Sequence, residues 1–177
     1  QFKSFPKTPS PLVVDMSSDI LSRKLDINDF DLIFAGAQKN IGPSGLTIVI
    51  IKKSLLDRCD ESTHSMLQYR THSSNNSMYN TPPTFGIYMA GLMFDWIDDQ
   101  GGLDVIQQNN ELKAKVLYNA INSNEMFYCP VPESDRSMMN VVFRIKGNHD
   151  DLEKTFVKEA KEVGLTELKG HRSVGGL

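Results

Sequence analysis

Two apolar segments of the chain are joined by the stretch Ala35-Gly36-Ala37-Gln38-Lys39-Asn40-Ile41-Gly42-Pro43-Ser44-Gly45. Before it, Asp31-Leu32-Ile33-Phe34 is typical of a short strand, and after it Leu46-Thr47-Ile48-Val49-Ile50-Ile51 is a continuous apolar, mostly β-branched run. Such a run predicts a strand that is buried on both faces of a sheet. The pattern therefore predicts an α/β fold in which Lys39 lies in a glycine-rich turn on a rigid scaffold.

A third candidate strand, Pro11 to Ser18, contains Asp15. Strands so close in sequence are expected to be neighbours in the sheet, which would place Asp15 and Lys39 in one cleft. Pyridoxal phosphate enzymes need such a pair, because an amine forms a Schiff base with the cofactor and a carboxylate keeps its ring nitrogen protonated. Two simpler interpretations stay open: Lys39 as a solvated loop cation, and Asp15 as a cap of the turn that follows it.

Four stretches of the chain resemble motifs of the pyridoxal-phosphate-dependent phosphoserine aminotransferases, in that family's order. They are Asp15-Met16-Ser17-Ser18, residues 35–45, Tyr79-Asn80-Thr81-Pro82-Pro83, and Lys169-Gly170-His171-Arg172-Ser173-Val174-Gly175-Gly176. The resemblance covers essentially the whole chain. It implies the carboxy-terminal half of a fold-type-I aminotransferase: part of the large domain, with a mainly parallel sheet, and a small α+β carboxy-terminal domain.

The resemblance also implies roles for residues around the cofactor. Lys39 would form the Schiff base with pyridoxal 5'-phosphate and then carry the proton between the substrate α-carbon and the cofactor. Asp15 would pair with the ring nitrogen, and Gln38 would bind the cofactor phosphate. Asn80 and Thr81 would reach the phosphate in the neighbouring subunit, which implies a homodimer with shared active sites. A simpler interpretation is that Thr81 caps a helix whose first turn contains prolines.

The last motif contains the implied substrate residues. His171 and Arg172 resemble the family's ligands for the substrate phosphate, a role that suits a guanidinium fork beside an imidazole. Without the resemblance, a solvated turn is the favoured interpretation of the same pair between glycines. The chain begins without methionine and stops inside this motif, so we expect a shortened form that lacks further site residues and is inactive alone.

The function implied is transamination between L-glutamate and 3-phosphohydroxypyruvate, giving O-phospho-L-serine and 2-oxoglutarate in L-serine biosynthesis. Two other functions stay open. In the first, the chain is a non-catalytic fragment that pairs with full-length subunits through residues 79–97. In the second, the chain belongs to another fold-type-I aminotransferase, a class that would keep Lys39 and Asp15 but does not predict His171 and Arg172.

Composition excludes several classes of partner. The net charge is −3 and the isoelectric point is about 5.8, which gives no support for nucleic-acid binding. No apolar run is long enough to span a bilayer. Cys59 and Cys129 lack metal-binding spacing, as do His64 and His72, so we predict no metal site and a reducing, cytoplasmic location.

The order of patterns predicts two domains, residues 1–97 and residues 98–177. Residues 84–99 predict a buried or interface helix, and a second helix follows whose apolar stripe, from Leu112 to Ile121, is assigned to the core with Met89 and Met93. Alternation over 139–146 predicts a strand, an Asp150/Glu153 capping box begins a helix that ends at Gly164, and residues 165–169 predict a returning strand.

Overall fold

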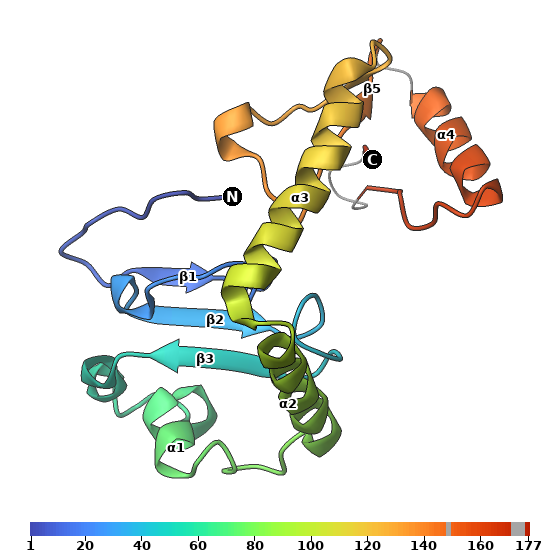
Figure 1. Cartoon of the computed structure of the whole chain (residues 1–177). Helices are drawn as coiled ribbons and strands as arrows, with labels where there is room; N and C mark the ends of the chain where they lie inside the picture. The colour runs from blue at the N-terminus through green and yellow to red at the C-terminus, as the bar shows by residue number, and fades with distance from the viewer. Residues whose placement is uncertain (148–149, 171–175) are drawn as a thin grey trace. The chain divides into compact units, whose positions relative to one another are not determined.

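The computed structural model describes residues 1–147, 150–170 and 176–177 (Figure 1). Its contacts divide the chain into two compact units, residues 5–107 and residues 1–4 with 108–177. This division concerns compactness alone, so the predicted domain boundary between residues 97 and 98 stays a prediction.

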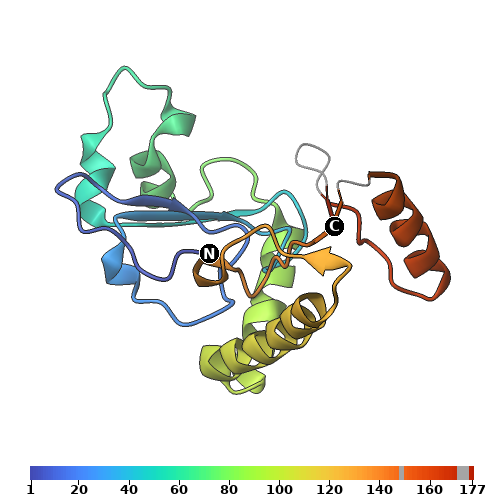
Figure 2. The same ribbon diagram turned by 90° about the horizontal axis from the view of Figure 1, so that it is seen from above.

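Three strands form the sheet of the first unit, in the order β1 (Val13–Asp15), β2 (Leu32–Gly36), β3 (Thr47–Ile51). All three predicted strands are confirmed, although β1 is shorter than expected. β1 and β2 run parallel, with Asp15 opposite Phe34, whereas β2 and β3 are antiparallel. Figure 2 shows this sheet edge-on.

The expectation that the 46–51 run is buried on both faces is wrong for the described residues. β3 is the last strand in the sheet order, and Val49 and Ile50 are 38% and 40% exposed. An edge strand of apolar residues is a surface that proteins ordinarily cover.

The core of the first unit includes residues of β2 and of the turn that follows it. Phe5 and Phe30 pack edge to face within it, with ring centroids 4.5 Å apart. Its buried members are Met16, Phe30, Ile33, Ala35, Ala37, Ile41 and Ala90. Because Ala37 and Ile41 are fully buried, the turn containing Lys39 is fixed at both ends by the core.

Helix α2 (Thr84–Asp99) packs on this turn through small residues. A Cβ on Gly42 would lie 3.6 Å from the Ala90 nitrogen, and a Cβ on Gly86 would lie 3.5 Å from the Leu46 Cβ. The large apolar residues of α2 lie elsewhere on the helix, and Tyr88 and Trp96 are 63% and 51% exposed. The predicted helix is confirmed, and its interface role stays a prediction.

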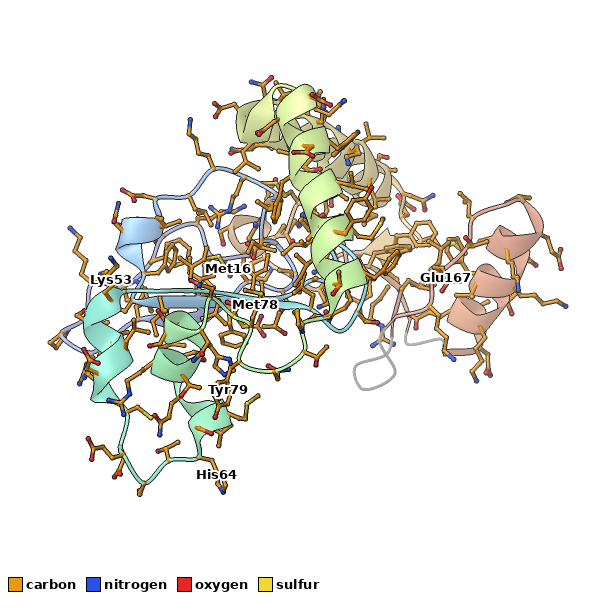
Figure 3. The ribbon with its side chains drawn as sticks, turned by 90° about the horizontal axis from the view of Figure 1, so that it is seen from below. Met16, Lys53, His64, Met78, Tyr79 and Glu167 are labelled. Atoms are coloured by element: carbon orange, nitrogen blue, oxygen red, sulfur yellow. The ribbon has the colours of Figure 1, made fainter. Side chains whose placement is uncertain are left out.

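The connection from β3 to α2 contains short helices that the sequence patterns did not reveal. They are η2 (Lys53–Arg58), η3 (Ser65–Leu67) and α1 (Tyr69–Ser74), and Figure 2 shows η2 and α1 on the same side of the sheet. His64, which precedes η3, points away from the rest of this unit (Figure 3). His72 contacts the Met66 carbonyl through Nε2 at 2.9 Å. The two histidines therefore lie on surface segments, as predicted.

The second unit is built from the carboxy-terminal part of α3 (Gly102–Ser123), a two-stranded sheet and α4 (Asp150–Glu162). The sheet pairs β4 (Phe127–Tyr128) with β5 (Arg144–Ile145) in antiparallel register. Its core contains Ile121, Phe143, Ile145 and Leu177. Three aromatic rings, Phe127, Phe143 and Phe156, contact one another edge to face.

Two predictions for this unit are wrong. The apolar stripe of α3 was assigned to the core, but Leu112 and Val116 are 62% and 72% exposed and only its last member, Ile121, is buried. Residues 165–169 form no strand. Glu167, labelled in Figure 3, has φ of +60°, which an extended strand does not allow. The 139–146 strand is confirmed only at β5, and Phe143 instead exchanges both backbone hydrogen bonds with Leu177 at 3.1 Å.

Glu153 was predicted to form a capping box with Asp150, whose side chain lies outside the described atoms. In the described part of the chain, Glu153 makes a two-pronged ion pair with Arg144, at 3.0 Å from Nε to Oε1 and 3.2 Å from Nη2 to Oε2. The Arg144 guanidinium holds the pKa of the Glu153 carboxyl below its usual value. This pair fastens α4 to β5.

Candidate functional site

The candidate site lies at the carboxyl ends of β1 and β2. β1 ends at Asp15 and β2 ends at Gly36, and because the two strands are parallel, both ends lie at the same edge of the sheet. Ligands of open α/β sheets bind outside such strand ends. Met16, labelled in Figure 3, follows Asp15 and is buried in the core, while Asp15 is exposed.

Asp15 is held by the turn that follows it. Its Oδ1 accepts hydrogen bonds from the Ser17 backbone N–H at 2.8 Å and from the Ser17 hydroxyl at 2.6 Å. These two bonds, and the nearby charge of Lys39, hold the pKa of the Asp15 carboxyl below its usual value. Asp15 therefore does cap its own turn, as the simpler interpretation had it, and remains an exposed, ionised acceptor.

Lys39 lies in a turn with little freedom of its own. The N–H groups of Ile41 and Gly42 both donate to the Ala37 carbonyl, at 3.0 and 2.9 Å, and the Asn40 side chain donates to the Ile20 carbonyl at 2.6 Å. Lys39 is exposed, and its Nζ donates to the Ser18 hydroxyl at 2.8 Å. The amine is therefore hydrogen-bonded to Ser18, three residues after Asp15, while remaining exposed.

Gln38 folds back over Gly36. A Cβ built on Gly36 would lie 2.5 Å from the Gln38 Oε1, so glycine leaves the space that the amide occupies. Gln38 is otherwise exposed, on the same turn as Lys39. An exposed amide in this place is free to turn toward a bound anion.

Asn80 and Thr81 lie on the exposed segment before α2. Thr81 is not the helix cap, because α2 begins at Thr84 and its N-cap is Pro83, which makes no side-chain capping bond. The Asn80 side chain donates to the Thr81 carbonyl at 3.4 Å. Among the described residues, no hydrogen bond or ion pair joins this segment to Asp15 or Lys39.

His171 and Arg172 lie outside the described residues. The described chain on either side of residues 171–175 is closed by a hydrogen bond from the Gly170 N–H to the Gly176 carbonyl, at 2.8 Å. Over the described ranges, no cluster of three or more His, Cys, Asp or Glu side chains is arranged as a metal site requires, and no helix has the length and apolarity to cross a membrane.

Two further residues of the site were quoted in a motif but given no role from the sequence. Ser17 contacts both Asp15 and the Gly36 N–H, the latter at 2.9 Å, and Ser18 contacts Lys39. The local signal was an aspartate two residues before a serine, which is typical of a side-chain-capped turn. The bonds to Gly36 and Lys39 depend on strand register and were not visible in the sequence.

Comparison with known proteins defines the class. The family model for aminotransferase class-V matches residues 5–176, so the chain belongs to that family. Within the family, the chain is 54% identical to phosphoserine aminotransferase of Geobacillus kaustophilus and 51% identical to that of Bacillus subtilis, with 99% of the chain covered in both cases. It is 49% identical to the chloroplastic phosphoserine aminotransferase 2 of Arabidopsis thaliana.

The chain spans about half the length of the curated relatives it matches, 49% for the Geobacillus and Bacillus proteins and 42% for the Arabidopsis protein. The resemblance stated from the four motifs is confirmed by these identities. The activity of a complete protein is therefore a question separate from the family of this chain.

Solved structures agree with the fold prediction. The phosphoserine aminotransferase of Bacillus circulans subsp. alkalophilus superimposes with a TM-score of 0.95 at 50% identity, over the whole chain and 49% of that structure. The pyridoxal-phosphate-bound enzyme of Trichomonas vaginalis gives 0.94 at 42% identity, over 100% of this chain and 50% of its own. The predicted α/β fold, part of a fold-type-I aminotransferase, is confirmed.

Proposed function

We propose that this chain supplies the lysine-bearing half of a pyridoxal-phosphate-dependent phosphoserine aminotransferase. The complete protein would exchange an amino group between L-glutamate and 3-phosphohydroxypyruvate, giving O-phospho-L-serine and 2-oxoglutarate in L-serine biosynthesis. One observation carries the proposal: Asp15 and the turn that contains Lys39 lie at the carboxyl ends of the parallel strands β1 and β2, where the Lys39 Nζ donates to the hydroxyl of Ser18 at 2.8 Å. The motifs that contain them belong to a chain about half identical to phosphoserine aminotransferases.

The residues present fit pyridoxal 5'-phosphate. Asp15 has one oxygen engaged by Ser17, which leaves the other for a protonated ring nitrogen. Lys39 offers an exposed amine for a covalent bond to the aldehyde, and Gln38 offers an amide for the phosphate. By the resemblance, Asn80 and Thr81 would bind the phosphate in a partner subunit. When bound, this cofactor supplies an electron sink for the bond that breaks at the substrate α-carbon.

The protein's own part is to place groups and move a proton. Lys39 would act as the base at the substrate α-carbon, and its Nζ is held by a hydrogen bond to the hydroxyl of Ser18, which follows β1. Asp15, held ionised, would keep the ring nitrogen protonated. His171 and Arg172 would bind the substrate phosphate, in a homodimer with shared sites. The free thiols Cys59 and Cys129 support a reducing compartment such as the cytoplasm.

The experiment is chemical capture of the lysine that holds the cofactor. The complete protein containing this half is incubated with pyridoxal phosphate and reduced with borohydride, and the modified lysine is located by peptide mass spectrometry. We expect modification at Lys39, lost in Lys39→Ala and retained in Lys24→Ala, a matched variant of an exposed lysine that pairs with Asp104 instead. Modification that persists in Lys39→Ala contradicts the proposal.

Substrate class is tested in the same assay. Phosphoserine added before reduction is expected to release Lys39 and lower the captured fraction, whereas serine is not, since it lacks the phosphate for His171 and Arg172. Equal effects of phosphoserine and serine favour another fold-type-I aminotransferase.

A second candidate, a non-catalytic fragment that pairs with full-length subunits, is favoured by the exposed apolar face of α2. Phe85, Tyr88 and Trp96 are each at least half exposed, at 69%, 63% and 51%. Sedimentation of the chain mixed with a full-length subunit distinguishes the two. A mixed dimer that is weakened by Tyr88→Ser, without capture at the fragment's own Lys39, supports the fragment role.

A further inference from the structure

The Asp15 carboxylate is engaged unevenly. Both Ser17 bonds, from the backbone N–H and from the hydroxyl, end on Oδ1. Among the described residues, no hydrogen bond to Oδ2 is present. One oxygen therefore fixes the group, and the other has no hydrogen-bond donor in the described part of the chain.

Ser17 connects this carboxylate to the neighbouring strand. The last backbone bond between the strands runs from the Met16 N–H to the Phe34 carbonyl, at 2.8 Å. The next donor along β2, the Gly36 N–H, binds the Ser17 hydroxyl oxygen at 2.9 Å. The side chain thus takes the place of a backbone acceptor at the point where β1 turns away.

The geometry points to Ser17 as a positioning residue for the cofactor: its hydroxyl, fixed by the Gly36 N–H, holds Oδ1 of Asp15 and thereby aims Oδ2 at the ring nitrogen. This inference rests on the proposed function and adds a residue to it. It requires the hydroxyl to act in both directions, as a donor to Asp15 and as an acceptor from Gly36, which one hydroxyl can do.

A local turn alone does not account for this arrangement. Asp60 and Ser62 form the same aspartate-to-serine turn, with both serine donors on Oδ1 at 2.8 and 2.7 Å. No described hydrogen bond ties the Ser62 hydroxyl to a neighbouring strand. The third bond, to Gly36, is what distinguishes Ser17 and fixes the direction of the Asp15 carboxylate relative to the turn that contains Lys39.

The first measurement needs no cofactor. Carboxyl carbon NMR on the 177-residue chain gives the pKa of Asp15 and of Asp60 separately. We expect Ser17→Ala to raise the pKa of Asp15 alone and Ser62→Ala to raise that of Asp60 alone, because each serine favours the charged form of its own aspartate. Ser17→Thr, which keeps the hydroxyl, is expected to restore the Asp15 value. An Asp15 pKa that is the same in Ser17→Ala overturns the inference.

The second measurement separates a loss of Asp15 orientation from a general loss of cofactor binding. In the complete protein, the dissociation constants of two ligands are compared: pyridoxal phosphate and the analogue whose ring nitrogen is replaced by carbon. Loss of one hydrogen bond that orients the acceptor is expected to weaken pyridoxal phosphate in Ser17→Ala by about fivefold and to leave the analogue unchanged. Equal weakening of both ligands means that Ser17 is only structural and overturns the inference.

The two failures are distinguishable. If the unaltered complete protein does not bind pyridoxal phosphate, the proposed function is wrong, whatever Ser17 does. If it binds the cofactor and Ser17→Ala binds it equally well, the function stands and the role of Ser17 is wrong.

Discussion

Asp15-Met16-Ser17 and Asp60-Glu61-Ser62 are the same turn in two parts of the first unit. In both, the serine N–H and hydroxyl donate to Oδ1 of the aspartate, at 2.8 and 2.6 Å in one and 2.8 and 2.7 Å in the other. In both, the serine hydroxyl is the main reason that the pKa of the aspartate carboxyl lies below its usual value. Local sequence alone produces this much.

The surroundings of the two turns differ. Asp60 lies between η2 and η3, where the only further backbone bond of the turn runs from the Thr63 N–H to the Asp60 carbonyl, among the described residues. Asp15 ends a strand, and its serine is bonded to Gly36 of the next strand, which directly precedes the turn that contains Lys39. The bond to the neighbouring strand, and not the turn itself, therefore distinguishes Asp15 from an ordinary capped aspartate.

The largest difference between the two turns is expected when each aspartate is neutralised. Asp15→Asn is expected to lower kcat of the complete protein on the order of 10²–10³-fold, the range for removing one preorganised electrostatic group. Asp60→Asn should leave kcat unchanged, since its carboxylate faces no site residue. Steady-state kinetics with phosphoserine decides this, and a comparable loss in both variants would show that the Asp15 effect comes from the turn itself.

Removing each serine tests stability. Ser17→Ala is expected to lower the free energy of unfolding by about 1–3 kcal/mol, because the partly buried Gly36 N–H loses its acceptor. Ser62→Ala, at an exposed turn, should stay within about 0.5 kcal/mol of the unaltered chain. Urea unfolding of the 177-residue chain gives both values. Equal costs would mean that the bond to Gly36 adds nothing to the turn.

Acid unfolding tests whether the Ser17 hydrogen bonds favour the ionised form of the Asp15 carboxyl. A carboxyl whose pKa is lowered in the folded state stabilises the fold above its unfolded value, ordinarily 3.8, and loses that contribution as the pH falls through the lowered pKa. The urea midpoint is therefore expected to fall on acidification through this window, and to fall less in Ser17→Ala, whose Asp15 pKa is nearer the unfolded value. A slope that is the same with and without Ser17 would show that its bonds do not favour the ionised form.

The sequence was a good guide where structure is local. The strand, turn, strand order around Lys39 follows from an apolar run, a glycine-rich stretch and a second apolar run, and all of these are short-range signals. The pairing of Asp15 with Lys39 at one edge followed from the expectation that neighbouring strands pair. The roles of Lys39, Asp15, Gln38, Asn80 and Thr81 came from the resemblance and stay predictions.

The sequence was a poor guide where one segment meets another. Large apolar residues of α3 predicted a core, yet Val116 is exposed and Ala114 is buried. On α2, Gly86 and Ala90 are buried where the helix packs on the Lys39 turn, because close approach there selects small side chains. The bond between Ser17 and Gly36 depends on strand register, which periodicity does not give.

The smallest effect is expected for a substitution at Gly36, whose backbone N–H binds Ser17. Gly36→Ala keeps the N–H that Ser17 accepts, and its new Cβ meets only the far end of the flexible Gln38 side chain, at 2.5 Å from Oε1. We expect a stability change of about 0.5 kcal/mol or less and an unchanged Asp15 pKa, because the Gln38 amide can swing aside while the bond to Ser17 remains. Urea unfolding and the same carboxyl NMR titration measure both. If Gly36→Ala raises the Asp15 pKa as Ser17→Ala does, the space beside Gly36, and not the Ser17 hydroxyl, controls the carboxylate.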